Sequence, residues 1–139
     1  MPVTWEDAER ILTTSKTIAV VGLSDKPDRH SHQIASYLQQ AGYRIVPVNP
    51  RIAEALGEKA YPSLRDIPER VDVVQIFRRS QDIPPIVDEA VAVGAKVVWM
   101  QSGIVHEEAA ARAEAAGATV VMDACMRSAH RALRASGRL

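Results

Sequence analysis

The stretch VVGLSDKPDRHSHQIASYL, residues 20–38, joins an apolar segment to a helical pattern through a polar loop. The apolar segment runs from Thr17 to Gly22 and is rich in β-branched residues, as in a strand buried on both faces of a parallel sheet. After Ser31, which we expect to cap a helix, apolar residues recur at helical spacing until Gly42. A strand that ends at a glycine and leads into a helix is how many α/β proteins hold phosphate groups.

The same alternation of apolar runs and helical patterns continues to the end of the chain. The spacing predicts strands over residues 17–22, 43–50, 71–77, 95–100 and 118–123, and helices over residues 4–15, 31–42, 80–94, 106–117 and 126–134, with a helical turn over 63–67. Five such alternations predict an α/β fold: a Rossmann-like, doubly wound, mainly parallel five-stranded sheet in a three-layer αβα arrangement. We expect residues 1–139 to form a single domain.

The composition narrows the class of protein. The 17 basic and 17 acidic side chains give a formal net charge of zero, which disfavours a nucleic-acid binder. The single cysteine excludes an internal disulfide, and no apolar run reaches the length of a membrane span. His30 and His32 point in different directions on a helix start and have no neighbouring ligand cluster, so we expect no metal site. These features predict a cytoplasmic protein without a nucleic-acid or membrane partner.

Ligands of open parallel sheets bind beyond the carboxyl ends of the strands, so the segments that follow the strands carry the functional signal. Three of these segments contain basic residues: Lys26 and Arg29, then Arg51, then Arg78 and Arg79. A neutral chain that gathers positive charge at one edge of its sheet is typical of a protein that binds a small polyanion.

The first loop argues against NAD as that polyanion. The NAD fingerprint needs G-x-G-x-x-G and then an acidic residue at the end of the second strand. Here Ser24 and Pro27 stand where the second and third glycines belong, and the second strand ends in Asn49-Pro50. A nucleotide with additional phosphate, met by Arg and Lys, fits these residues better.

Three stretches in order, PVNP, FRR and WMQSGI, carry a family resemblance. Together with the first loop and the final HRAL, they make residues 17–133 closely similar to the small stand-alone coenzyme A-binding proteins. These proteins resemble the N-terminal nucleotide-binding domain of the succinyl-CoA synthetase α subunit. The synthetase's phosphorylated histidine and its ATP-grasp domain have no counterpart in this sequence, so the resemblance does not imply synthetase activity.

The resemblance implies that coenzyme A is the ligand and that four turns contact it. The matching residues are Gly22, Leu23, Ser24, Asp25, Lys26 and Pro27 in the first loop, Asn49, Pro50 and Arg51 after the second strand, Phe77, Arg78 and Arg79 after the third, and Met100, Gln101, Ser102 and Gly103 after the fourth. Two further residues come from the sequence itself: Arg29 for its positive charge, and Ser31 because it begins a predicted helix whose N-terminus attracts phosphate.

From these residues we derive a hypothesis for the binding mode. The diphosphate lies on the Gly22–Ser24 loop and at the helix start near Ser31, while Lys26, Arg29 and Arg51 hold the phosphates around the adenosine. Phe77 and the stem of Arg78 pack on the adenine or on the pantetheine arm. The sequence does not decide whether Phe77 and Arg78 contact the adenine or the pantetheine arm.

A further candidate residue is Cys125, which follows the last strand at a predicted helix start. It is either a small packed residue or a thiol that forms a mixed disulfide with the thiol of coenzyme A. A triad with Asp123 and His130 is disfavoured because Cys125 and His130 are five residues apart and diverge on a helix. We expect Asp123 to cap that helix and Trp99 to lie in the core or under the ligand.

The sequence therefore predicts a protein that binds coenzyme A or an acyl-CoA, with no catalytic residue assigned. An enzyme that handles acyl-CoA and a regulatory partner that responds to coenzyme A remain alternatives, and a homo-oligomer or a protein partner also stays open.

Overall fold

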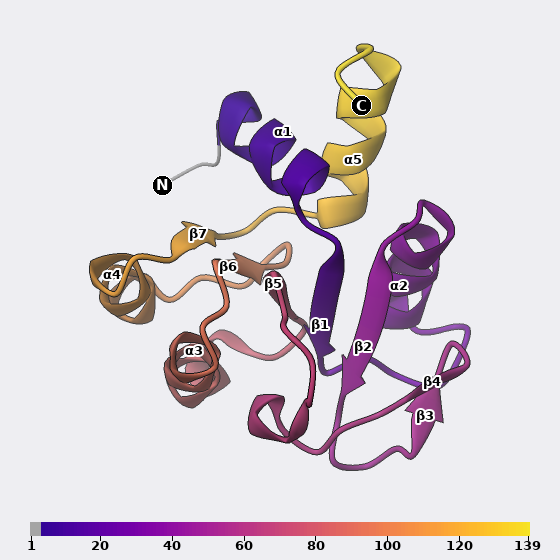
Figure 1. The fold of residues 1–139 in the computed structure, drawn as a ribbon, viewed down its shortest axis with the longest axis vertical. Helices are drawn as coiled ribbons and strands as arrows, with labels where there is room; N and C mark the ends of the chain where they lie inside the picture. Colours follow the sequence, from indigo (N-terminus) through magenta and orange to yellow (C-terminus); the bar gives the residue numbers. More distant parts are fainter. Residues whose placement is uncertain (1–3) are drawn as a thin grey trace.

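A computed structural model describes residues 4–139 and places a parallel five-stranded sheet at the centre of the molecule (Figure 1). Its strands are β1 (Thr17–Val21), β2 (Arg44–Val48), β5 (Val73–Ile76), β6 (Val97–Met100) and β7 (Thr119–Val121). They lie in the order β2-β1-β5-β6-β7. The chain thus builds outward from β1 to β2, and then crosses back to continue from β5 on the other side. The direction of winding reverses between β1 and β5, which is where such sheets bind ligands.

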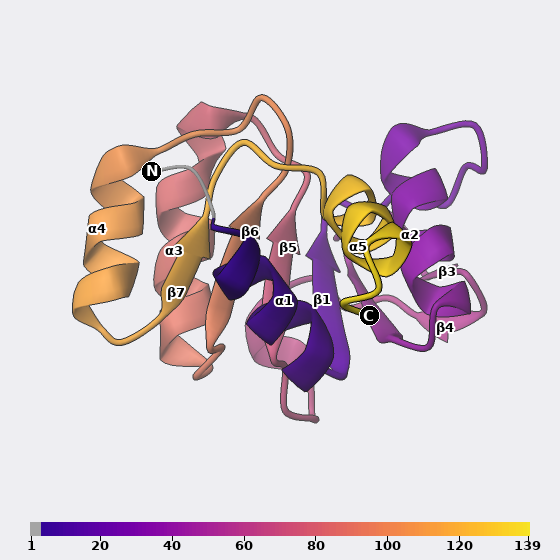
Figure 2. The ribbon, with the colours of Figure 1, turned by 90° about the horizontal axis from the view of Figure 1, so that it is seen from above.

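Helices cover both faces of the sheet, as Figure 2 shows from above. They are α1 (Trp5–Thr14), α2 (His30–Gln40), α3 (Ile83–Ala92), α4 (Glu107–Ala115) and α5 (Met126–Ala135). One apolar layer joins the sheet to α1, α2 and α5, and a second joins it to α3 and α4. This arrangement confirms the predicted Rossmann-like αβα fold. Within residues 4–139, no helix is both long and apolar enough to cross a membrane.

The structure shortens several predicted elements and adds one. A two-stranded antiparallel hairpin, β3 (Glu54–Ala55) and β4 (Glu58–Lys59), occupies a segment predicted as a loop. Its turn places Leu56 and Gly57 at positive φ, 54° and 75°. The predicted helix over 80–94 begins as a 3-10 turn, η2 (Ser80–Asp82), before α3, and the turn predicted over 63–67 is η1 (Leu64–Asp66).

The fold accommodates a proline within the sheet and a tryptophan in the core. Pro47 lies in β2, an edge strand of the sheet, where a missing N–H is tolerated. Its carbonyl still accepts a hydrogen bond from the Tyr61 backbone N–H. Trp99 is fully buried, as predicted, and its indole N–H donates to the carbonyl of Ala124 at 2.8 Å.

The amino ends of the strands are tied together by polar contacts. The carboxylate of Asp72, just before β5, accepts hydrogen bonds from the backbone N–H groups of Lys16 (2.9 Å) and Thr17 (3.0 Å) at the start of β1. Arg44, at the start of β2, pairs with Glu69 at 2.6 Å and Glu58 at 3.0 Å. These contacts fix the relative positions of three strands at the edge opposite the predicted site.

We expect Asp72→Ala to lower the free energy of unfolding by about 2 kcal/mol at neutral pH, because two strand N–H groups lose their acceptor. Burial acts to raise the pKa of Asp72, but the N–H groups of Lys16 and Thr17, together with the positive charges of Arg70 and Lys96, outweigh it and hold the pKa below its ordinary value of 3.8. A depressed folded-state pKa gives stability that is present above about pH 4 and lost as the pH falls further. Urea unfolding of both proteins at pH 7 and pH 3 measures this, and an equal difference at the two pH values would contradict it.

Candidate functional site

A cleft of about 680 Å³ opens at the carboxyl edge of the sheet, over β2, β1 and β5. It is lined by Gly22, Ser24, Asp25, Lys26, Arg29, His30, Ser31, Asn49, Arg51, Ile52, Phe77 and Arg78. Ten of these twelve were predicted from the sequence, and we call this hollow the basic cleft. Its position matches the reversal of winding between β1 and β5.

Gly22 lines the basic cleft at a position where only glycine fits. It has φ +87°, and a Cβ atom built on it would lie 2.4 Å from the backbone oxygen of Phe77. The Gly22 N–H donates to the carbonyl of Val48, and the Phe77 N–H donates to that of Val21, both at 2.8 Å. The turn after β1 is therefore in direct contact with the ends of both neighbouring strands.

Ser31 and Asn49 shape the loops of the basic cleft. The buried hydroxyl of Ser31 accepts a hydrogen bond from the Ser24 N–H at 3.1 Å, and the Ser24 hydroxyl accepts one from the Lys26 N–H at 3.1 Å. The prediction that Ser31 caps its helix is wrong, because Arg29 holds the N-cap position and Ser31 instead anchors the loop. The Asn49 amide donates to the Leu23 carbonyl and accepts from the Arg51 N–H.

The basic cleft carries a net positive charge. Lys26, Arg29 and Arg51 are exposed, Arg78 is half-buried, and none of the four forms an ion pair within residues 4–139. Asp25 is the one carboxylate among the lining residues. Four cations without a protein counter-ion around one hollow attract an anion with several charges.

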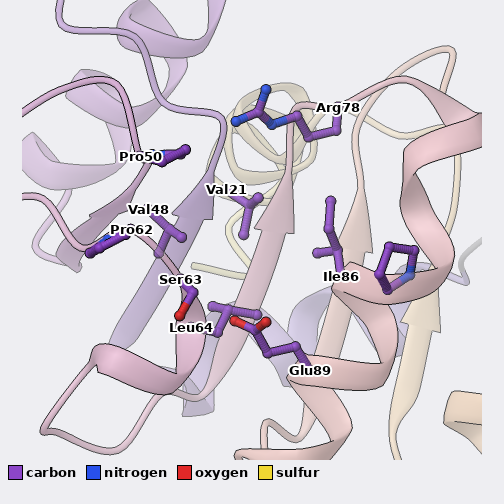
Figure 3. A pocket seen from close by; sticks show the side chains of 10 residues that line it. Val21, Val48, Pro50, Pro62, Ser63, Leu64, Arg78, Ile86 and Glu89 are labelled. Atoms are coloured by element: carbon purple, nitrogen blue, oxygen red, sulfur yellow. The ribbon is translucent and has the colours of Figure 1, made fainter.

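A narrower apolar crevice of about 230 Å³ adjoins the basic cleft, and Arg78 lines both (Figure 3). Its walls come from five separate parts of the chain. They are formed by Val21, Val48, Pro50, Pro62, Ser63, Leu64, Arg78, Pro85, Ile86 and Glu89. Figure 3 shows the Arg78 guanidinium at one end and the Glu89 carboxylate at the other. One oxygen of that carboxylate accepts from the Arg65 N–H at 3.2 Å.

The other predicted site residues lie outside the basic cleft. Leu23 is fully buried, Pro27 is exposed on the loop, and Pro50 lines the apolar crevice instead. Arg79 pairs with Asp82 at 3.3 Å and lines a separate surface hollow that Phe77 and Arg78 share. Met100 and Gln101 are buried at the end of β6, and Ser102 and Gly103 form an exposed turn beyond it.

The sequence analysis missed two residues of the basic cleft, His30 and Ile52. Both are direct neighbours of predicted residues, Arg29 and Arg51, so adjacency alone was a usable signal. The wall formed by Leu64 and Ile86 in the apolar crevice had no such signal, because those residues come from segments far from any predicted binding loop.

Cys125, Asp123 and His130 do not assemble into a triad. Asp123 accepts from the Gly103 N–H at 2.6 Å, so the prediction that it caps α5 is wrong, and Cys125 holds the N-cap position. The buried His130 shares its Nδ1 with the Tyr37 hydroxyl at 2.8 Å. Among the residues that the structure describes, no three His, Cys, Asp or Glu side chains are grouped to hold a metal ion.

Comparison with known families agrees with this geometry. The model of the family described as "CoA binding domain" matches residues 16–131, from just before β1 to within α5. The chain belongs to this CoA binding domain family. An uncharacterised member of similar length, YneT of Bacillus subtilis (strain 168), is 49% identical over 124 residues, which cover 89% of this chain and 92% of that protein.

Two further relatives place this CoA binding domain among stand-alone and multidomain proteins. A solved structure of a hypothetical protein from Pyrococcus horikoshii OT3 is 41% identical, with a TM-score of 0.92 and coverage of 96% of both chains. The ADP-forming acetate–CoA ligase II of Archaeoglobus fulgidus is 35% identical over 101 residues. That match covers 70% of this chain and 15% of the ligase.

Proposed function

We propose that this protein binds coenzyme A, or a thioester of it, in the basic cleft. One observation carries the proposal: four cations without protein counter-ions line the same cleft. They surround the turn at Gly22, which lies where the direction of winding of the sheet reverses. Coenzyme A carries a diphosphate and a 3′-phosphate with roughly four negative charges. The family match and the likeness to an ADP-forming acetate–CoA ligase support this choice among polyanions.

The phosphates are assigned to groups that surround the basic cleft. The diphosphate lies against the Gly22–Ser24 turn, where the backbone approaches closely and the amino end of α2 adds its positive dipole. Lys26, Arg29 and Arg51, which are exposed and free to reorient, take the outer phosphate oxygens. Arginine forks bind these oxygens in pairs, whereas lysine supplies a point charge.

The adenine is assigned to the apolar crevice rather than to the basic cleft itself. Flat aromatic rings favour narrow apolar hollows, and the crevice has aliphatic and proline walls. The Glu89 carboxylate at its far end has an oxygen that can accept from the exocyclic amine of adenine, and the Arg78 guanidinium stands at the mouth, beside the phosphates. The pantetheine arm then leaves the phosphates on the opposite side, toward β6.

Calorimetric titration of the protein with coenzyme A at low and moderate salt tests the proposal directly. We expect binding whose affinity falls as salt screens the phosphate contacts. Dephospho-coenzyme A is the matched ligand, because it lacks only the 3′-phosphate and should bind more weakly. Absence of heat with coenzyme A at low salt would contradict the proposed function.

Glu89→Gln tests the adenine assignment. We expect the affinity for coenzyme A to fall about tenfold, because an acceptor oriented toward the adenine amine loses its charge. Phosphopantetheine, which has no adenine, should bind wild type and variant alike. The same calorimetric titration with both ligands measures this, and a similar loss for phosphopantetheine would place the arm, not the adenine, in the crevice.

A further inference from the structure

Gln101, at the end of β6, is 2% exposed and has a fixed orientation. Its Oε1 accepts from the Gln75 side-chain amide and from the Met126 backbone N–H, both at 3.0 Å. Because two donors meet that atom, exchanging the oxygen and nitrogen of Gln101 would bring donors against donors. Its Nε2 therefore points the other way, and within residues 4–139 it has no hydrogen-bond partner.

Backbone contacts on both sides of Cys125 bring it next to this amide, because the Ala124 N–H donates to the Met100 carbonyl and the Met126 N–H donates to Gln101 Oε1. Cys125 is half-buried, holds the N-cap of the ten-residue helix α5 and is the single cysteine of the chain. Burial acts to raise the pKa of the thiol, but the Ser128 hydroxyl and N–H, the Gln101 amide and the Arg127 N–H outweigh it and lower the pKa. A neutral thiol is a weak acceptor and a thiolate a strong one, so ionisation gives the unpaired Gln101 N–H its partner.

The segment before Cys125 lies at the same carboxyl edge of the sheet as the basic cleft. Gln101 follows β6 as Phe77 and Arg78 follow β5, and neighbouring strands are about 4.8 Å apart. The Ala124 N–H donates to the Met100 carbonyl at 3.3 Å, which holds the segment before α5 over the end of β6. A pantetheine arm, as long as about four extended residues, spans about 14 Å. The ends of β1 and β6 are two strand spacings apart, about 10 Å, which is less than the length of this arm.

We propose that Cys125 is a thiol–disulfide exchange site for coenzyme A bound in the basic cleft, with Gln101 as its positioning residue. The inference rests on the proposed function. The co-substrate is a disulfide of coenzyme A. The Cys125 thiolate attacks one sulfur, the ligand's S–S bond breaks, and a Cys125–S–S–CoA bond forms. The second coenzyme A leaves as a thiolate and takes up a proton from solvent, so one disulfide replaces another without net oxidation.

Intact-mass spectrometry of the protein after mixing with the symmetric disulfide of coenzyme A tests the exchange. We expect one adduct of one coenzyme A moiety that dithiothreitol removes, and a rate that saturates with concentration. The rate at low concentration should exceed that with glutathione disulfide by about tenfold or more, because binding brings the sulfur to the thiol. Cys125→Ser should give no adduct. Equal, non-saturating rates with the two disulfides would overturn the proposal.

Calorimetry on Cys125→Ser with coenzyme A separates the two levels of inference. Heat with coenzyme A but no saturable exchange in the wild type overturns the exchange site and leaves the binding cleft intact. Absence of heat overturns both.

The role of Gln101 is tested by the pH dependence of alkylation with iodoacetamide. We expect the midpoint of this profile to rise in Gln101→Met, because the thiolate loses an N–H donor. Ser128→Ala changes an exposed side chain, so it serves as a second variant that keeps the helix contacts of Gln101, and its midpoint should also rise. An unchanged midpoint in Gln101→Met beside a raised one in Ser128→Ala, or unchanged midpoints in both, would overturn the assigned role of Gln101.

Discussion

Gly22→Ala is expected to abolish measurable coenzyme A binding and to lower the free energy of unfolding by about 3 kcal/mol or more. A Cβ at this position would meet the backbone oxygen of Phe77 at 2.4 Å, so the turn after β1 and the end of β5 must move apart. The positive φ of +87° adds about 1–2 kcal/mol for any residue with a side chain. Because the displaced turn lines the basic cleft, the substitution is expected to weaken ligand binding as well as to destabilise the fold.

Gly57→Ala is the matched control for this prediction. Gly57 has a similar φ of +75°, but nothing lies within 4 Å of a Cβ built on it. It should therefore show only the conformational cost, about 1 kcal/mol, and bind coenzyme A as the wild type does. Urea unfolding and calorimetric titration of both variants give the comparison. A Gly22→Ala protein that binds coenzyme A with wild-type affinity would contradict the assignment of the turn.

The second large effect is expected from the double variant Arg29→Ala/Arg51→Ala, whose affinity for coenzyme A should fall about 100-fold. Each exposed arginine supplies about 1.5 kcal/mol of charge-assisted contact to phosphate, and about 1.4 kcal/mol corresponds to a factor of ten. The affinity of the variant should also vary less with salt than that of the wild type, since fewer charge pairs are left to screen.

A control that removes the same charge elsewhere is available at the other edge of the sheet. Arg70 and Lys96 are exposed and precede β5 and β6, so Arg70→Ala/Lys96→Ala changes the net charge equally without touching the basic cleft. Its affinity should stay within about threefold of the wild type, because the charges are more than a Debye length of about 10 Å from the ligand. Equal losses in the two double variants would mean that only the overall charge matters, and would contradict the proposed site.

Much of the fold follows from local pattern. The run from Thr17 to Gly22 and those before Phe77 and Met100 are apolar on every residue or nearly so, and short strands buried on both faces are built in this way. Four of the five positive charges predicted after three strands line one cleft, because parallel strands bring their carboxyl ends to one edge, whereas Arg79 pairs with Asp82 outside it. The hairpin at residues 54–59 escaped prediction because its two-residue strands are too short to show a period.

The limits of the site prediction have equally local causes. Ser31 has the residue type of a helix cap, but the Ser24 N–H competes for its hydroxyl, and spacing carries no information about such a competition. The family resemblance implied a ligand contact for Gln101, yet its side chain is held by Gln75 and Met126, which are 26 and 25 residues away in sequence. The pairing of distant residues decided these cases, and a single sequence does not display it.

The polar ties of Asp72 and Arg44 lie at the amino ends of the strands, whereas the basic cleft lies at the carboxyl ends. Residues that stabilise the sheet and residues that select the ligand thus lie at opposite ends of the same strands. Substitutions at Asp72 or Arg44 are therefore expected to change stability without changing the lining of the basic cleft, whereas at Gly22 stability and binding change together.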